Sequence, residues 1–144
     1  MMVCLQKNNT GDPIMPFINI EVSGTTVTQN QINQITTNMT QIMAKTAHKQ
    51  AALTSVRIGQ GTANAWSIGG QIAEHAVRAH MDIHVTQGTN DDTEIADLVR
   101  LGHGELEQAF GSLDDATYVI VHEHPATNWG YGGRTQGARK SDPG

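Results

Sequence analysis

The spacing of apolar and polar residues changes twice along the first half of the chain. Residues 17–22 alternate apolar with less apolar side chains, which is typical of a strand with one buried face. Thr28 and Gln31 form the sequence pattern of a capping box, and an apolar stripe at helical spacing then continues to about residue 47. Over residues 53–58 apolar and polar side chains alternate again. The pattern predicts a strand, an amphipathic helix and a second strand.

The second half repeats this order. Residues 80–85 alternate as a strand, and Asp91 and Glu94 form a second capping-box pattern. An apolar stripe follows as far as Phe110, and residues 116–121 form the last predicted strand. The second half therefore predicts another strand, helix and strand.

The two halves align as a repeat of one unit. Residues 16–77 and 79–140 match without a gap at an offset of 63. Gly102 lies inside the second predicted helix and aligns with Met39 of the first. We expect the helix to approach the sheet closely at this glycine. Ten aligned positions are identical: Ile20/Ile83, Val22/Val85, Thr26/Thr89, Ile32/Ile95, Thr54/Thr117, Val56/Val119, Ala63/Ala126, Trp66/Trp129, Gly69/Gly132 and Gly70/Gly133. A repeated supersecondary unit predicts two tandem βαβ units.

The repeat also predicts the domain organisation. We expect a first unit over residues 16–77, a second over 78–140, and one integrated α+β domain with a four-stranded sheet and two helices on one face. Residues 1–15 have no counterpart and are interpreted as a disordered leader or a misassigned start, and residues 141–144 as a tail. One sheet face would stay uncovered, which indicates oligomerisation.

Composition narrows the class of protein. The 144 residues carry a net charge of −5 with a pI near 5.7 and no run of Lys or Arg, which argues against a nucleic-acid surface. Cys4 is the one cysteine, so no internal disulfide can form. The sequence has neither a secretory signal nor an apolar stretch long enough to span a membrane. We expect a soluble cytoplasmic protein.

Pro16, which follows Met15 at the start of the first strand, allows two interpretations. It is a strand-boundary residue if the chain continues before it. If translation starts at Met15 or the leader is removed, Pro16 has a free secondary amine with an ordinary pKa of about 8. Apolar surroundings or a neighbouring arginine would lower that pKa toward 7, where a general base works best.

Three segments together resemble a known family. They are Met15-Pro16, Leu-Thr-Ser-Val-Arg at residues 53–57, and Trp-Ser-Ile-Gly-Gly at residues 66–70. They resemble the 4-oxalocrotonate tautomerase unit, and residues 128–134 look like the second unit of fused members of the tautomerase superfamily. The resemblance covers residues 16–140. It implies a cofactor-free, metal-free enzyme that moves a proton on an enol or dienol acid with an amino-terminal proline, assembled as a homotrimer.

The resemblance also implies roles for four residues. Pro16 takes the place of the catalytic base and Arg57 that of the arginine that binds a small carboxylic acid substrate. Trp66 takes the place of the aromatic wall, and Arg134 is a further substrate-binding candidate. The alternatives are an Arg57 paired with a surface acid, a Trp66 that anchors a hairpin, and an Arg134 that caps one.

The chain also departs from the family pattern. A second carboxylate-binding arginine would fall on Thr26, which carries no charge, so a dicarboxylate substrate is not predicted. Ala79 and Ile120 take the proline and arginine positions of the second unit, which predicts one active site per chain. Residues 86–90 lack the arginine pair of fused dehalogenases and decarboxylases.

The histidines are the remaining candidate for chemistry. His122 and His124 share one strand face, as do His80 and His84, and such spacing can ligate zinc. Solvated histidines at strand ends are the commoner case, so we predict no metal site. The function expected is that of a tautomerase acting on an enol or a 2-oxo or 2-hydroxydienoic acid. The alternatives are a catalytically silent trimer that serves as a binding or scaffold protein, and a hydratase- or dehalogenase-like member.

Overall fold

The computed structural model describes residues 15–62, 65–72 and 77–141. The predictions for residues 1–14 and 142–144 lie outside this part of the chain. The first unit contains β1 (Phe17–Ser23), α2 (Gln29–Thr46) and β2 (Ser55–Gln60), with the short 3₁₀ helix η1 (Ala51–Leu53) before β2. The second contains β5 (Arg78–Thr86), α3 (Asp92–Phe110) and β6 (Tyr118–His124).

The four long strands form one mixed sheet in the order β2-β1-β5-β6. Each unit pairs its own two strands in parallel, β1 with β2 and β5 with β6. The units join through β1 and β5, which run antiparallel with Phe17 opposite His84. The start of β1 therefore lies beside the end of β5, and residues far apart in the sequence meet at that edge.

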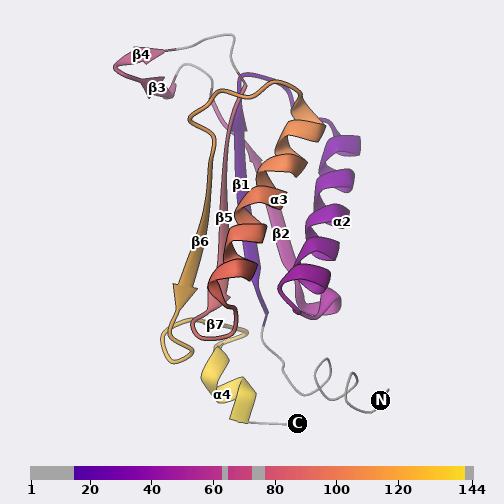
Figure 1. The fold of residues 1–144 in the computed structure, drawn as a ribbon, viewed down its shortest axis with the longest axis vertical. Helices are drawn as coiled ribbons and strands as arrows, with labels where there is room; N and C mark the ends of the chain where they lie inside the picture. The colour runs from indigo at the N-terminus through magenta and orange to yellow at the C-terminus, as the bar shows by residue number, and fades with distance from the viewer. Residues whose placement is uncertain (1–14, 63–64, 73–76, 142–144) are drawn as a thin grey trace.

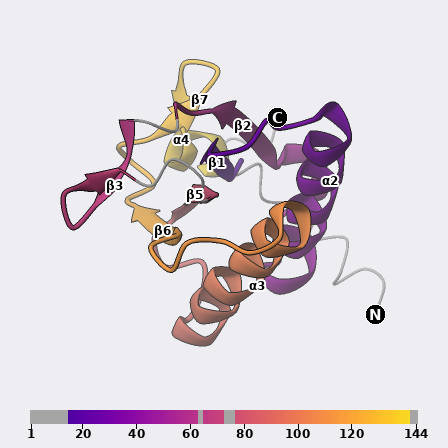
Figure 2. The same ribbon diagram turned by 90° about the horizontal axis from the view of Figure 1, so that it is seen from above.

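Helices α2 and α3 lie side by side on one face of the sheet (Figures 1 and 2). The alternate strand residues predicted to be apolar, such as Ile20 and Ile83, point toward the helices and are completely buried with Met39, Met43, Leu98 and Leu106. Residues between them face the other side, because successive side chains in a strand alternate. The predicted α+β fold, with a four-stranded sheet and both helices on one face, is confirmed.

Both predicted capping boxes are present. The side chain of Thr28 accepts a hydrogen bond from the backbone of Gln31, whose side chain accepts one from the backbone of Thr28, and Asp91 and Glu94 make the same pair. The hydrogen bond from the Asp91 backbone lowers the pKa of Glu94, with Asn90 adding to the effect. Each box satisfies amides that the first helical turn leaves unpaired.

The expected close contact at Gly102 is confirmed. A Cβ atom at this position would lie 2.9 Å from the sulfur of Met81 and 3.3 Å from a methyl group of Val119. Helix α3 thus approaches the sheet more closely than a side chain would allow. This accounts for a glycine inside the helix despite its cost of about 1 kcal/mol relative to alanine.

Some boundaries differ from the prediction. The second strand starts at Ser55 and not at residue 53, because Leu53 belongs to η1, where its amide donates to the carbonyl of Gln50. The last strand starts at Tyr118, because Asp114 holds Ala116 and Thr117 in a turn. In both cases a local hydrogen bond delays the strand.

Two hairpins and a short helix complete the described chain. The hairpins are β3 (Ser67–Ile68) with β4 (Gln71–Ile72), and β7 (Gly130–Tyr131) with β8 (Arg134–Thr135). Gly69, Gly70, Gly132 and Gly133 turn them with positive φ angles between 60° and 82°. The short helix α4 (Gln136–Ser141) follows the second hairpin and was not predicted from the sequence.

Candidate functional site

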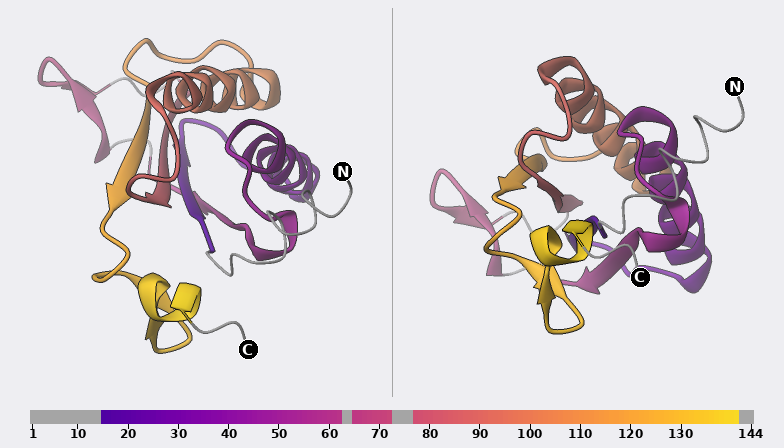
Figure 3. Two further views of the ribbon diagram at one scale, coloured as in Figure 1. Left: turned by 60° about the horizontal axis from the view of Figure 1, so that its bottom comes forward. Right: turned by 90° about the horizontal axis from the view of Figure 1, so that it is seen from below.

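A pocket of about 390 Å³ opens at the end of the sheet where β1 begins. Figure 3 shows α4 and the β7–β8 hairpin at this end of the molecule. The pocket is lined by residues from both units: Met15, Phe17, Ser55, His84, Trp129, Gly130, Tyr131 and Gln136. The antiparallel pairing of β1 with β5 creates it, because that pairing brings the hairpin after β6 next to the start of β1.

Pro16 lies between two pocket-lining residues, Met15 and Phe17, and is buried. Its carbonyl accepts a hydrogen bond of 3.1 Å from the amide of Ser55, which fixes the start of β1 against β2. The predicted position of Pro16 at the opening of the first strand is therefore correct. Aromatic residues of the second unit form much of the wall beside it.

Gln136 holds the residue before Pro16. Its side-chain amide accepts a hydrogen bond from the backbone N–H of Met15 at 3.2 Å and donates one to the Met15 carbonyl at 3.0 Å. Gln136 is only 1% exposed, so both hydrogen bonds are shielded from water. In this arrangement Met15 occupies the position directly before the Pro16 nitrogen and forms part of the pocket wall.

His84 contributes an imidazole to the same pocket. Its Nδ1 atom lies 2.8 Å from Nε2 of His124, and its ring stacks on that of Phe17 at a centroid distance of 5.8 Å. Trp129 lies against His124 and donates its indole N–H to the hydroxyl of Thr86. Burial lowers the pKa of His84, and the positive potential of His122 and His124 adds to this effect, so the imidazole is neutral at pH 7.

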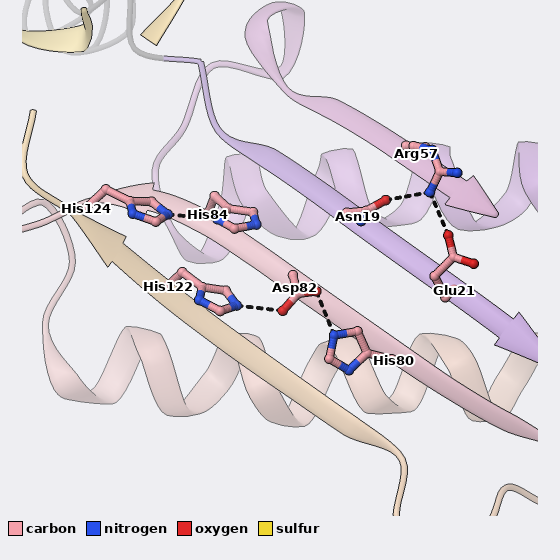
Figure 4. A network of polar contacts seen from close by, with 8 residues as sticks. All are labelled: Asn19, Glu21, Arg57, His80, Asp82, His84, His122 and His124. Atoms are coloured by element: carbon pink, nitrogen blue, oxygen red, sulfur yellow. Dashed lines mark hydrogen bonds and ion pairs between the residues drawn. The ribbon is translucent and has the colours of Figure 1, made fainter. Parts of the chain in front are cut away.

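A second polar cluster continues along the open face of the sheet (Figure 4). The carboxylate of Asp82 lies 2.6 Å from Nε2 of His80 and 2.5 Å from Nε2 of His122. Burial raises the pKa of Asp82, but the hydrogen bonds from the two histidines outweigh it and hold that pKa below its ordinary value of 3.8. The cluster is therefore an ionised carboxylate between two imidazole donors.

Arg57 lies on the open face at the edge of the sheet, away from the pocket lining. Its guanidinium donates to the carboxylate of Glu21 and to the side-chain oxygen of Asn19, both at 2.8 Å (Figure 4). The side chain is 56% exposed. Within one chain Arg57 thus makes the surface ion pair named above as the alternative to substrate binding.

Trp66 and Arg134 lie apart from each other. Trp66 precedes the β3–β4 hairpin, at the opposite end of the sheet from the start of β1 (Figure 1), and its carbonyl accepts a hydrogen bond from the buried Arg78. Arg134 lines a separate hollow of about 380 Å³ beside Trp129 and donates to the carbonyl of Ala138. The single chain does not bring either residue into the pocket beside Pro16.

Four residues of the pocket were given no role from the sequence: Ser55, Trp129, Tyr131 and Gln136. His84 was considered from the sequence only as a candidate metal ligand. One signal was available for Trp129, because the repeat aligns it with Trp66. To predict which of the two tryptophans lines the pocket, one must know which hairpin lies at the same end of the sheet as the start of β1. That depends on the pairing of β1 with β5, a contact between residues that are 55 (Ser23 and Arg78) to 67 (Phe17 and His84) positions apart.

Two further findings concern ligands and membranes. Across residues 15–62, 65–72 and 77–141, no three His, Cys, Asp or Glu side chains converge as metal ligands. The described helices do not include one that is long and apolar enough to cross a membrane.

Sequence comparison relates the chain to one enzyme family. Residues 80–139 match the family model described as "Tautomerase enzyme". The "Probable tautomerase K2" of Dickeya dadantii (strain 3937) is 37% identical over 57 residues, which is 40% of this chain and 85% of that protein.

Solved structures share the fold over most of the chain. A symmetric trimer of wild-type fused 4-OT has a TM-score of 0.75 at 14% identity, covering 85% of this chain and 98% of that one. The structure of native fused 4-OT has a TM-score of 0.74 at 15% identity, and the match covers 85% of this chain and 97% of that one. A macrophage migration inhibitory factor-like protein from Entamoeba histolytica has a TM-score of 0.69 at 22% identity, and the match covers 84% of this chain and 98% of that one.

Proposed function

The chain belongs to the tautomerase superfamily as a member with two fused units, and on this basis we propose that it is a cofactor-free isomerase of small enol or 2-oxo or 2-hydroxydienoic acids. Its general base would be the amine of Pro16 in a chain that begins at that residue. One observation carries the proposal: Pro16 is buried between Met15 and Phe17, two residues that line a pocket large enough for such an acid.

The surroundings of Pro16 suit an amine base. Phe17, Trp129 and Tyr131 give the pocket an aromatic wall that limits contact with water. Loss of hydration disfavours the charged form of an amine, so its pKa would fall from about 8 toward neutrality. The amine would exchange a proton with a carbon atom of the substrate, so the product would be an isomer of the substrate.

The proposal gives Arg57, Trp66 and Arg134 roles in substrate binding. Arg57 and Trp66 lie away from the pocket of their own chain, so we infer that they act on the pocket of a neighbouring copy in a homotrimer. A guanidinium binds a carboxylate through two parallel hydrogen bonds, which suits a carboxylic acid substrate. Arg57 would exchange its contact with Glu21 for that carboxylate.

The test is an assay of enol ketonisation. A chain that begins at Pro16 should ketonise phenylenolpyruvate or 2-hydroxymuconate without added metal or cofactor. In that chain Arg57→Ala should lower kcat/KM about 10- to 100-fold, because a charge-assisted contact contributes about 1.5–3 kcal/mol. The control is Arg100→Ala, which removes an exposed arginine paired with Asp97 on the surface of α3. No turnover by the unaltered chain, or equal kcat/KM in the two variants, would contradict the proposal.

The homotrimer is a separate prediction, to be checked by sedimentation at micromolar concentration. Ile120 and Tyr118 expose apolar surface on the open sheet face, which an interface would cover. Ile120→Glu should therefore dissociate the trimer into monomers. Val99→Glu is the matched control, because Val99 and Ile120 are both 38% exposed but Val99 lies on α3. A monomeric unaltered chain, or dissociation by both variants, would count against assembly through the open face.

The contact between Gln136 and Met15 favours one alternative. If the chain continues before Pro16 in the native protein, the two hydrogen bonds from Gln136 hold Met15 against the proline nitrogen. The protein would then be a catalytically silent member of the family, acting as a binding or scaffold protein. Intact-mass measurement of the native protein distinguishes the tautomerase from the catalytically silent protein, because it shows whether Pro16 is the first residue.

A further inference from the structure

We propose that His84, oriented by its hydrogen bond to His124, is a second proton-transfer group of the pocket and acts on the hydroxyl or carbonyl oxygen of the enol or 2-oxo acid. The inference rests on the proposed function of the same pocket. It assigns a catalytic role to an imidazole that comes from the second unit. The pocket would thus hold one proton-transfer group from each unit of the repeat.

Position supports this role. His84 lies directly opposite Phe17 in the antiparallel pairing of β1 with β5, and both residues line the pocket. Phe17 is in turn the residue that follows Pro16. A substrate in this pocket would therefore lie beside both the start of β1 and the imidazole of His84.

The orientation of the ring is fixed on several sides. His84 stacks on His122 at a centroid distance of 4.6 Å and lies nearly parallel to His124 at 5.0 Å, in addition to its contact with Phe17. The Nδ1 atom of His84 lies 2.8 Å from Nε2 of His124. A preorganised ring loses little freedom when it reacts, which is what a proton-transfer group requires.

Because Nδ1 of His84 is occupied by the contact with His124, Nε2 is the ring nitrogen left to exchange a proton with a substrate. When Nδ1 of His84 carries the hydrogen and donates it to His124, Nε2 of His84 presents a lone pair. Uptake of a proton at Nε2 leaves the hydrogen bond to His124 in place. His84 can therefore alternate between its neutral and charged forms without rearranging its partner.

The surrounding charges favour the neutral form at rest. The titratable groups that act on His84 are His122 and His124 from β6 and Asp82 on its own strand, while β1 contributes the uncharged ring of Phe17. Burial and the two histidines lower the pKa of His84, and Asp82 opposes them in part. At pH 7 the imidazole can therefore accept a proton.

The protons of the reaction balance when His84 acts at the oxygen and Pro16 acts at the carbon of the substrate. In ketonisation the enol O–H bond breaks and its proton goes to Nε2 of His84, while the C=C electron pair takes a proton from the Pro16 ammonium. In the reverse direction the Pro16 amine removes the carbon-bound proton and the His84 imidazolium protonates the oxygen. One proton leaves the substrate and one enters it, so the product is an isomer, and water resets the two groups.

The experiment uses a chain that begins at Pro16 and carries His84→Asn. The asparagine amide reproduces the hydrogen-bond donor at Nδ1 but has no titratable group. We expect kcat for phenylenolpyruvate ketonisation to fall about 100-fold, the lower range for loss of a general base. In the unaltered chain, kcat/KM should decrease as the pH falls through the pKa of His84, below 6.5, because protonation removes the base. That acidic decrease should be absent in His84→Asn.

Three comparisons separate this role from a structural one. His103→Asn, on α3 and outside the pocket, should leave kcat and the pH profile unchanged. His124→Gln, which retains a polar group near Nε2, should keep more activity than His124→Ala. Circular dichroism should show that each variant is folded. Unchanged kcat and pH profile in both His84→Asn and His124→Ala would overturn the assignment.

Failure of the proposed function gives a different result. If the unaltered chain does not ketonise the enol, NMR titration of His84 with the 2-oxo acid phenylpyruvate decides whether the pocket binds such acids. A shift in the pKa of His84 on binding would support its contact with the acid. An unchanged titration would overturn the inference together with the proposed function.

Discussion

A preparation that begins at Met1 should ketonise phenylenolpyruvate at least about 100-fold more slowly than one that begins at Pro16, because it would lack the proposed general base. The nitrogen of an internal proline belongs to an amide, whose lone pair is delocalised into the carbonyl, so it does not accept a proton near neutral pH. The contact of Met15 with Gln136 adds a steric effect, because Met15 occupies the position next to the nitrogen. Both effects act in the same direction.

Two further preparations separate the chemical effect from the steric one. A chain that begins at Met15 has the shortest extension that keeps the Pro16 nitrogen in an amide, and it should be as slow as the full chain. Adding Gln136→Ala to the full chain should release Met15 without restoring activity. Pro16→Ala in the shortened chain leaves a primary amine and should lose most of the rate. Equal turnover by a full chain of verified mass and the shortened chain would mean that Pro16 is not the base.

Ile83→Ala should destabilise the protein by about 2–5 kcal/mol, the usual cost of truncating a fully buried large aliphatic side chain. Ile83 is 0% exposed at the centre of β5, opposite Ile18 of β1 and Val121 of β6. Its truncation would leave a cavity where the two units share their core. Chemical denaturation at one fixed protein concentration measures the change, since the stability of an oligomer depends on concentration.

The control for this prediction is the same substitution at an exposed site. Ile72→Ala lies in the β3–β4 hairpin, where the isoleucine is 45% exposed, and should change the free energy of unfolding by no more than about 0.5 kcal/mol. An equal loss of stability at both positions would contradict the assignment of Ile83 to the shared core.

The sequence alone was sufficient for the order of the long strands and helices and for the family. Strand alternation, helical spacing and the two capping boxes act over a few residues, so the order of elements in each half could be predicted. The repeat then indicated two βαβ units, and the motif at residues 53–57 with the Trp-x-x-Gly-Gly turns indicated the tautomerase superfamily. Pro16 was correctly expected at the start of the first strand.

The composition of the pocket was decided only by the tertiary structure. The repeat pairs Trp66 with Trp129 but does not say which one faces Pro16, and a short-range pattern could not indicate that Gln136 begins a helix and binds Met15. The ion pair of Arg57 with Glu21 likewise depends on the register of β1 with β2. Local preferences determine helices and strands because their hydrogen bonds and side-chain spacing are local. The pocket depends on the antiparallel pairing of β1 with β5, a contact between distant residues that is set by burial of the shared core.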